Sequence, residues 1–151
     1  MKKIFLTILA FVFIFSLAGP VMAKKIKAPK SLCLESTEMS MSISTSKGGK
    51  IVIAAGKINS YDIQGLLIHS TSTFPNPISG SGYMMGDLFV FSFSSILLGT
   101  ELVPCNGDIL WEVDSPTAMA VMVFHVPSQG LIESEIELTV IACDEFEPVS
   151  P

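Results

Sequence analysis

The fold class is decided by residues 89–94, which read Phe-Val-Phe-Ser-Phe-Ser. The three phenylalanines occupy every second position, and Ser92 and Ser94 point the other way. Successive side chains of a β-strand face opposite sides of the sheet, so this alternation predicts a strand with one aromatic face in the core and one polar face in water. The stretch therefore predicts an antiparallel sheet that buries one of its faces.

The same alternation recurs through most of the chain, whereas helical periodicity is nearly absent after the first 23 residues. It predicts eight strands, at about residues 39–43, 50–55, 61–69, 78–85, 89–93, 109–113, 118–126 and 136–142. Turn-forming pairs fall between these runs, among them Gly48-Gly49, Asn59-Ser60 and Gly86-Asp87. The chain is expected to be all-β.

Eight strands joined mostly by short connections favour an eight-stranded antiparallel up-and-down barrel, because closure removes the exposed edges of a flat sheet. A two-sheet β-sandwich would use the same strands and is the alternative. In outline the barrel resembles the calycin architecture of lipocalins and avidins. The chain departs from both patterns, since its only tryptophan is Trp111 and no Gly-x-Trp motif precedes the first strand. No family is assigned.

The expected connections differ in length at the two ends of the barrel. Loops at 70–77, 98–107 and 127–134 share one end, and short turns close the other. Functional residues concentrate on loops that a rigid scaffold holds, so a ligand is expected at the long-loop end. The candidate ligand-binding residues are His69 and His125 at the rim and, as lining, Trp111, Phe89 and Phe91.

The N-terminus has the pattern of a secretory signal peptide, with two lysines, an uncharged apolar run and Val21-Met22-Ala23. Cleavage is expected after Ala23, which places the mature protein in the periplasm or outside a bacterial cell. The expected division is a signal peptide at 1–23, a flexible segment at 24–31, one β domain at 32–144 and a flexible tail at 145–151.

The charge balance excludes some classes of partner. Loss of the leader removes two of nine basic residues and none of fourteen acidic ones, which leaves a mature net charge of −7. The chain has no arginine, and nucleic-acid recognition relies on arginine and on a positive field, so no nucleic-acid partner is expected. Stable membrane insertion after leader cleavage is not expected either.

No catalytic set or cofactor motif emerges. Ser79-Gly80-Ser81-Gly82 lacks the order of a nucleophile elbow. Glu133, Glu135 and Glu137 alternate along the solvated face of a strand, so they are not expected to converge as catalytic acids. The protein is therefore expected not to be an enzyme.

Three cysteines lie in the exported part of the chain, where an oxidising compartment favours pairing. The first and last strands of a closed meander are neighbours, so Cys33 is expected to pair with Cys143. Cys105 is expected in a loop at the long-loop end, near the two histidines. No cysteine or histidine spacing suits a metal site, and none is predicted.

These observations leave two functions open. The favoured one is an exported, non-enzymatic module that binds a small apolar molecule or a protein at the long-loop end. The alternative is a structural or surface-adhesion β-sandwich that acts through protein contacts.

Overall fold

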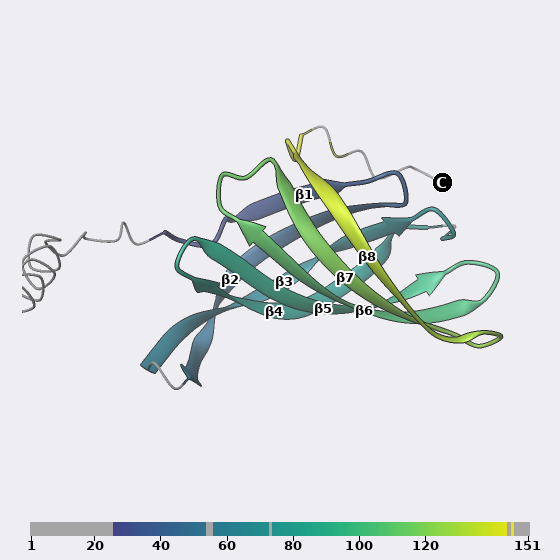
Figure 1. Ribbon diagram of the computed structural model, residues 1–151, viewed down its shortest axis with the longest axis horizontal. Coiled ribbons are helices and arrows are strands. Elements are labelled where there is room, and N and C mark those ends of the chain that lie inside the picture. Colours follow the sequence, from purple (N-terminus) through teal and green to yellow (C-terminus); the bar gives the residue numbers. More distant parts are fainter. Residues whose placement is uncertain (1–25, 54–55, 73, 145, 147–151) are drawn as a thin grey trace, which may run out of the picture.

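A computed structural model describes residues 26–53, 56–72, 74–144 and 146. Its eight strands form one antiparallel sheet in which each strand pairs with the next and β8 returns to β1, so the sheet closes into a barrel (Figure 1). The strands are β1 (Ser31–Glu35), β2 (Met39–Ile53), β3 (Gly56–His69), β4 (Asn76–Met85), β5 (Leu88–Leu98), β6 (Leu102–Glu112), β7 (Thr117–Val126) and β8 (Gly130–Ile141). The predicted all-β, up-and-down architecture is confirmed, and the sandwich alternative is not formed.

The barrel interior is filled by the side chains that the alternation assigned to it. Phe89 and Phe91 are almost completely buried, and Trp111 is 7% exposed. Ser92 and Glu112, their neighbours in the chain, face solvent. Aromatic rings pack along β5, with 5.3 Å between the ring centroids of Phe89 and Phe91. The predicted phase of these strands is confirmed.

The first two predicted strands are wrong in their boundaries. Residues 39–43 and 50–53 belong to one long strand, β2, and the true first strand is β1, which begins where a flexible segment was expected. Asn59-Ser60, expected as a turn, lies within β3. Gly48-Gly49 is therefore no turn. It lies in a β-bulge, where Lys47 pairs with Tyr61 and Lys50 pairs with Asn59. Turn-forming residues such as glycine also accommodate the bend of a bulge, so the sequence signal was ambiguous.

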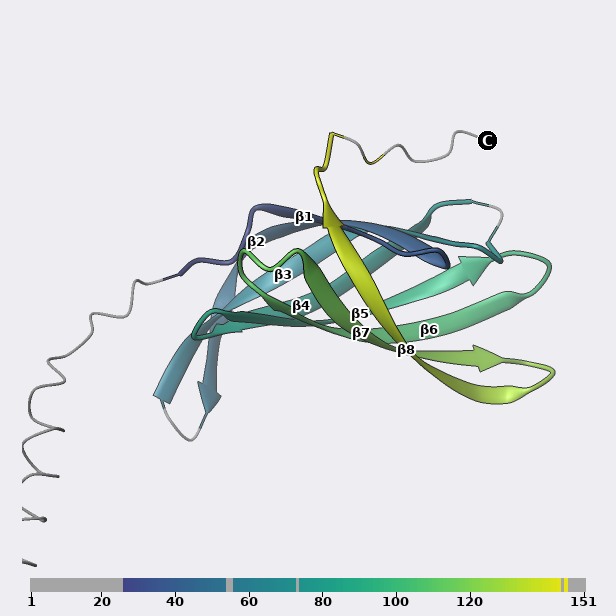
Figure 2. The same cartoon turned by 45° about the horizontal axis from the view of Figure 1, so that its top comes forward.

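The outer parts of β2 and β3 extend beyond the barrel as a two-stranded hairpin (Figures 1 and 2). β1 pairs with β2 only as far as Ser44, and β4 pairs with β3 only from Ser60 onward. Among the described strands, residues 50–53 and 56–59 pair only with each other. We call this part, residues 45–53 of β2 and 56–60 of β3, the projecting hairpin. The end of the barrel that carries it is called the hairpin end.

The opposite end, which we call the loop end, has shorter connections than predicted. β6 begins at Leu102 and β8 at Gly130, so two of the three expected long loops shrink to 99–101 and 127–129. The connection at 70–75 is the longest at this end. Asn106-Gly107, which closes the predicted loop 98–107, lies inside β6. The predicted difference in loop length between the two ends is therefore mostly absent.

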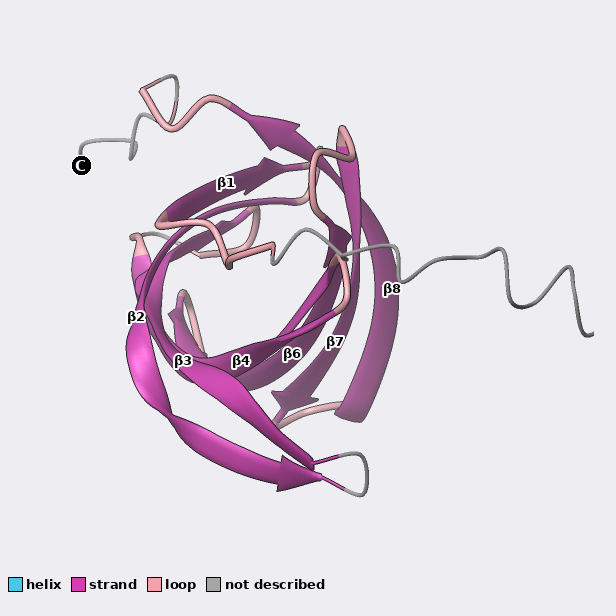
Figure 3. Ribbon diagram, turned by 90° about the vertical axis from the view of Figure 1, so that its left-hand side faces the viewer, coloured by secondary structure: helices cyan, strands magenta, loops and turns pink. Residues whose placement is uncertain are grey.

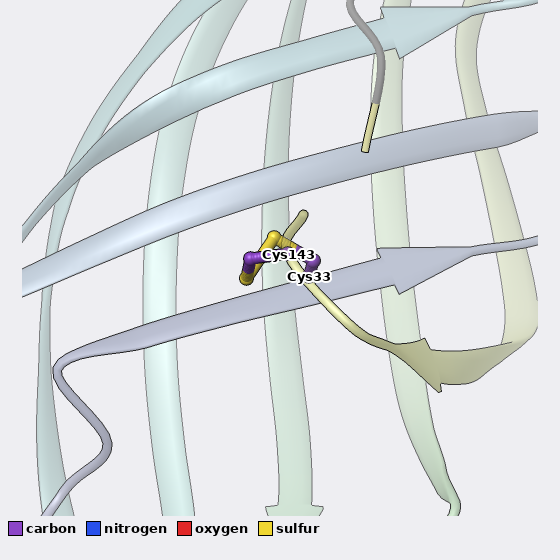
Figure 4. The surroundings of a disulfide bond; sticks show 2 residues. All are labelled: Cys33 and Cys143. Atoms are coloured by element: carbon purple, nitrogen blue, oxygen red, sulfur yellow. A yellow bond between two sulfur atoms is a disulfide. The ribbon is translucent and has the colours of Figure 1, made fainter. Parts of the chain in front are cut away.

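The seam between β1 and β8 is the shortest in the barrel, with Cys33–Glu35 opposite Thr139–Ile141. Cys33 forms a disulfide with Cys143, just beyond the end of β8 (Figure 4). Their Cα atoms are 5.3 Å apart and 110 residues apart in the chain. The predicted pairing is confirmed. The disulfide links β1 covalently to the end of β8, in addition to the few backbone hydrogen bonds between these two strands.

The described part of the N-terminal segment, residues 26–30, runs across the opening of the ring at the hairpin end (Figure 3). The Thr45 amide donates a hydrogen bond of 2.9 Å to the Lys30 carbonyl oxygen, and the Thr45 hydroxyl donates to that of Pro29. Ala28 packs against the core. The predicted leader at 1–23 and all of the predicted tail at 145–151 except Phe146 lie outside the described residues. No helix in the described ranges is long and apolar enough to cross a bilayer.

Candidate functional site

The two histidines proposed for the rim lie at the loop end but do not face each other. His69 ends β3 and its ring packs on Phe124, with 5.4 Å between centroids. The Thr71 amide donates to His69 Nδ1 at 3.2 Å, and the Thr71 hydroxyl lies 2.8 Å from the same nitrogen. Burial lowers the pKa of His69 and the Glu38 carboxylate partly opposes that shift. His125 is exposed on the outer face of β7. The structure therefore does not bring the two rings together.

Cys105 is not in a loop, as predicted, but in β6 with its side chain in the core. Cys105 is 1% exposed, and burial raises the pKa of its thiol to about 11. A thiol that stays protonated is a poor nucleophile and a poor metal ligand. Among the described residues, no three His, Cys, Asp or Glu side chains come together in a way that could hold a metal ion.

The aromatic candidates lie in the core, towards the hairpin end. Phe89 and Trp111 are direct cross-strand neighbours on β5 and β6, near the ends of both strands. The indole Nε1 of Trp111 donates to the carbonyl oxygen of Ser115 in the β6–β7 turn, at 3.0 Å. Tyr61 contacts Phe89 edge to face, with 6.1 Å between centroids. These residues form the layer of the core beneath the hairpin end, far from the histidines.

An open cleft of about 1280 Å³ lies at the hairpin end, opposite the end where the sequence predicted a site. The N-terminal segment, the projecting hairpin and the β4–β5 turn enclose it. We call it the basic cleft, because all five lysines of the described residues line it. Of the twelve acidic residues in the same part of the chain, only Asp87 does. The cleft is lined by Ile26, Lys27, Ala28, Lys30, Thr45, Ser46, Lys47, Lys50, Lys57, Ile58, Asn59, Tyr61, Met84, Gly86 and Asp87.

The β-bulge determines which way the hairpin lysines point. Lys47 and Lys50 are three residues apart, so a regular strand would place them on opposite faces. In the bulge, Lys47 and Lys50 of β2 are three residues apart, whereas their partners on β3, Tyr61 and Asn59, are two residues apart. Directly opposed residues of antiparallel strands share a face. Lys47 and Lys50 therefore share the face of Tyr61, which is continuous with the barrel interior.

The third hairpin lysine, Lys57, lies on the same face as Lys47 and Lys50. Lys57 lies two positions from Asn59 on β3 and pairs with Val52 of β2. Glycine at position 48 suits the bulge, because a Cβ there would lie 2.7 Å from the Ser60 hydroxyl oxygen. The hairpin thus presents three ammonium groups on one face, and Lys27 and Lys30 of the N-terminal segment add two more.

The floor of the cleft is apolar. Tyr61, Met84 and Ala28 are half-buried and pack against the core cluster. Ile26 and Ile58 add apolar surface to the walls, and the aliphatic stems of the lysines add more. The greater part of the lining surface is apolar. The cleft thus combines an apolar floor with a positively charged rim.

Sequence reasoning missed this cleft although two signals for it were present. The lysines of the mature chain cluster between residues 24 and 57, whereas acidic residues dominate from Glu101 onward. An asymmetry of this kind is also typical of ordinary solvation of a protein surface, so by itself it does not single out a site. The second signal was Gly48-Gly49, which separated two short strands in the prediction and so hid the hairpin that carries three of the lysines.

Comparisons with known proteins add no assignment. No protein-family profile matches the chain, and neither the curated proteins nor the solved structures searched contain a significant match. The site therefore rests on its own geometry.

Proposed function

We propose that this protein is an exported, non-enzymatic binding module whose ligand carries negative charge and occupies the basic cleft. The observation that carries the proposal is the convergence of all five described lysines on one cleft of a chain with a net charge of −5. Dispersed lysines would serve solubility equally well. A cleft lined by charges of one sign concentrates oppositely charged ligands and accelerates their association.

Export is part of the proposal and has two supports. The leader has the pattern of a signal peptide. The Cys33–Cys143 disulfide is of a kind that forms and persists in oxidising compartments such as the periplasm.

The proposal is tested with the mature chain, residues 24–151, by titration calorimetry with hexanoate, hexyl sulfate and hexyl phosphate. Hexyltrimethylammonium is the cationic counterpart. We expect at least one anion to bind, the cation not to bind, and affinity to fall as salt is raised from 50 to 500 mM, because partly exposed charges are screened.

The variant that locates the site is Lys47→Gln/Lys50→Gln. Its matched control is Thr100→Glu/Ser128→Glu, which makes the same change of −2 in net charge at exposed positions of the loop end. The first variant is expected to weaken anion binding at least tenfold and the second to leave it within twofold. Equal losses would mean that only net charge matters, and no binding of any anion would overturn the proposal.

A second candidate is protein adhesion at the loop end, where large apolar side chains are exposed. Phe74 is 47% exposed, Leu102 64% and Leu131 74%, each in or beside a different connection. Exposed apolar residues of this kind favour protein contacts when they are contiguous. Concentration-dependent self-association that is lost in Leu102→Ser/Leu131→Ser would favour this function over ligand binding.

A further inference from the structure

The basic cleft is larger and more apolar than a site for a small inorganic anion requires. Its volume of about 1280 Å³ exceeds the ~300–1,000 Å³ typical of pockets for small molecules. The charged residues that line it, the five lysines and Asp87, are all exposed. The floor, built by Tyr61, Met84 and Ala28, offers a ligand no charged group.

From this division we infer that the ligand is an amphipathic anion with a long apolar tail, such as an alkyl carboxylate. The inference rests on the proposed function and adds the ligand's chemical class and orientation. The anionic head lies against Lys47, Lys50 and Lys57. The tail lies along the floor, in contact with Met84 and Tyr61.

The orientation follows from where each group sits along the inner face of β2 and β3. Tyr61 is at the level where the hairpin leaves the barrel, and its ring contacts Phe89 of the core. Lys50 and Lys57 lie farther out, where the two strands pair only with each other. If the ligand enters with its tail first, the tail therefore contacts the core layer around Tyr61 and Phe89. The anionic head then lies beside Lys50 and Lys57, near water.

The N-terminal segment, which runs beside β2 at Thr45, forms a second wall of the cleft. Its carbonyl groups are held to Thr45 by two hydrogen bonds, and Ala28 packs on the core. Lys27 and Lys30 of this segment are exposed and line the cleft. An anionic head thus meets lysines from the segment as well as from the hairpin, and a neutral or cationic amphiphile would gain nothing from these charges.

The test is a chain-length series of alkyl carboxylates from hexanoate to hexadecanoate, each below its critical micelle concentration. Burial of a methylene group stabilises binding enough to raise affinity by about two- to fourfold. We expect that increase for each added CH2 until the tail outgrows the floor. Trp111, next to Phe89 in the core layer, provides a fluorescence readout besides calorimetry.

Two neighbouring methionines of β4 supply a matched pair of variants. Met84 lines the cleft, whereas Met85 is 58% exposed and does not. Met84→Gln is expected to reduce the gain per CH2 and Met85→Gln to preserve it. A thermal melt of each variant shows that it is folded before binding is measured.

The outcomes separate this inference from the proposed function. Binding of hexanoate that is sensitive to salt and to Lys47→Gln/Lys50→Gln, without any gain along the series, would overturn the inference and keep the function. Equal affinity for an alkyl alcohol of the same length would also overturn the inference, because the head would then contribute nothing. No binding of any carboxylate, sulfate or phosphate would overturn both.

The same headgroup and tail also occur in a bilayer of anionic lipid. Sedimentation with vesicles of phosphatidylglycerol, compared with phosphatidylcholine, distinguishes that source from free amphiphile. Binding of dissolved dodecanoate without co-sedimentation supports a carried ligand. Co-sedimentation with phosphatidylglycerol in the absence of dodecanoate binding would overturn the inference of a carried ligand.

Discussion

The projecting hairpin is made of the outer parts of β2 and β3, two of the eight strands of the closed barrel, but the two regions are under different constraints. Inside the barrel, one face of each strand must be buried, so the sequence alternates and its pattern can be read directly. In the hairpin, residues 50–53 and 56–59 have no other strand beside them, and the pattern relaxes into lysines, glycines and exposed apolar residues. The barrel carries the stability of the protein, and the hairpin carries the chemistry that we assign to it.

The largest expected effect concerns the seam that closes the barrel. On the chain-entropy model, a bridge spanning 110 residues contributes roughly 4–5 kcal/mol to the free energy of unfolding. Cys33→Ser/Cys143→Ser should therefore lower that free energy by about this amount in urea denaturation. Cys105→Ala in the intact protein is the control for loss of a thiol without loss of the bridge, because it adds no polar group to the core. A double variant as stable as the native protein would mean that the seam closes without the disulfide.

The second-largest effect on the free energy of unfolding is expected in the core. Phe91→Ala removes a side chain that is 1% exposed and should lower the free energy of unfolding by about 3–5 kcal/mol. Ser92→Ala, one position along on the solvent face, should change it by less than about 0.5 kcal/mol. Similar urea midpoints for the two variants would contradict the strand phase that both sequence and structure assign.

A smaller effect is expected at Asn76, a buried polar residue at the loop end. Its amide nitrogen donates to the carbonyl oxygens of Leu67 at 3.1 Å and Phe74 at 2.9 Å. Its amide oxygen accepts a hydrogen bond of 2.7 Å from the Leu98 amide. Asn76→Ala leaves these buried groups without partners, which should cost about 1–3 kcal/mol in urea denaturation. An unchanged midpoint would mean that water replaces the lost amide.

The smallest effect on stability is expected in the hairpin. Lys47→Gln/Lys50→Gln changes exposed side chains outside the closed ring, so the free energy of unfolding should move by less than about 0.5 kcal/mol. The same variant is the one expected to lose anion binding. A large loss of stability in thermal melts would mean that the hairpin supports the barrel, contrary to the division drawn above.

The barrel could be predicted because each of its strands shows the same local pattern, an alternation of buried apolar and exposed polar residues. Alternation around Phe91 and Trp111 identified the core face, and the neighbourhood of the first and last strands in a closed meander identified the Cys33–Cys143 pair. The short strand β1 was missed because its buried cysteine faces outward beneath the disulfide, so Leu32, Cys33 and Leu34 are all buried and show no alternation.

The candidate site could not be predicted by the same means. Whether Gly48-Gly49 forms a turn or a bulge depends on pairing with Asn59 and Tyr61, which only the folded sheet reveals. Two loop lengths at the other end were overestimated because the predicted loops 98–107 and 127–134 include the first residues of β6 and β8, which begin at Leu102 and Gly130. The predicted binding residues therefore lie at two different ends of the barrel. His69 and His125 are at the loop end, and Trp111 and Phe89 are beneath the cleft.

The most direct test of the account is a two-dimensional NMR titration of the isotope-labelled mature protein with dodecanoate. The account predicts that backbone amide signals shift at the hairpin end, foremost those of Lys47, Tyr61, Met84 and Asp87. Signals of the loop end, including those of His69 and His125, should stay in place. Shifts concentrated at the loop end, or no saturable shift at any residue, would contradict the assignment of the basic cleft as the binding site.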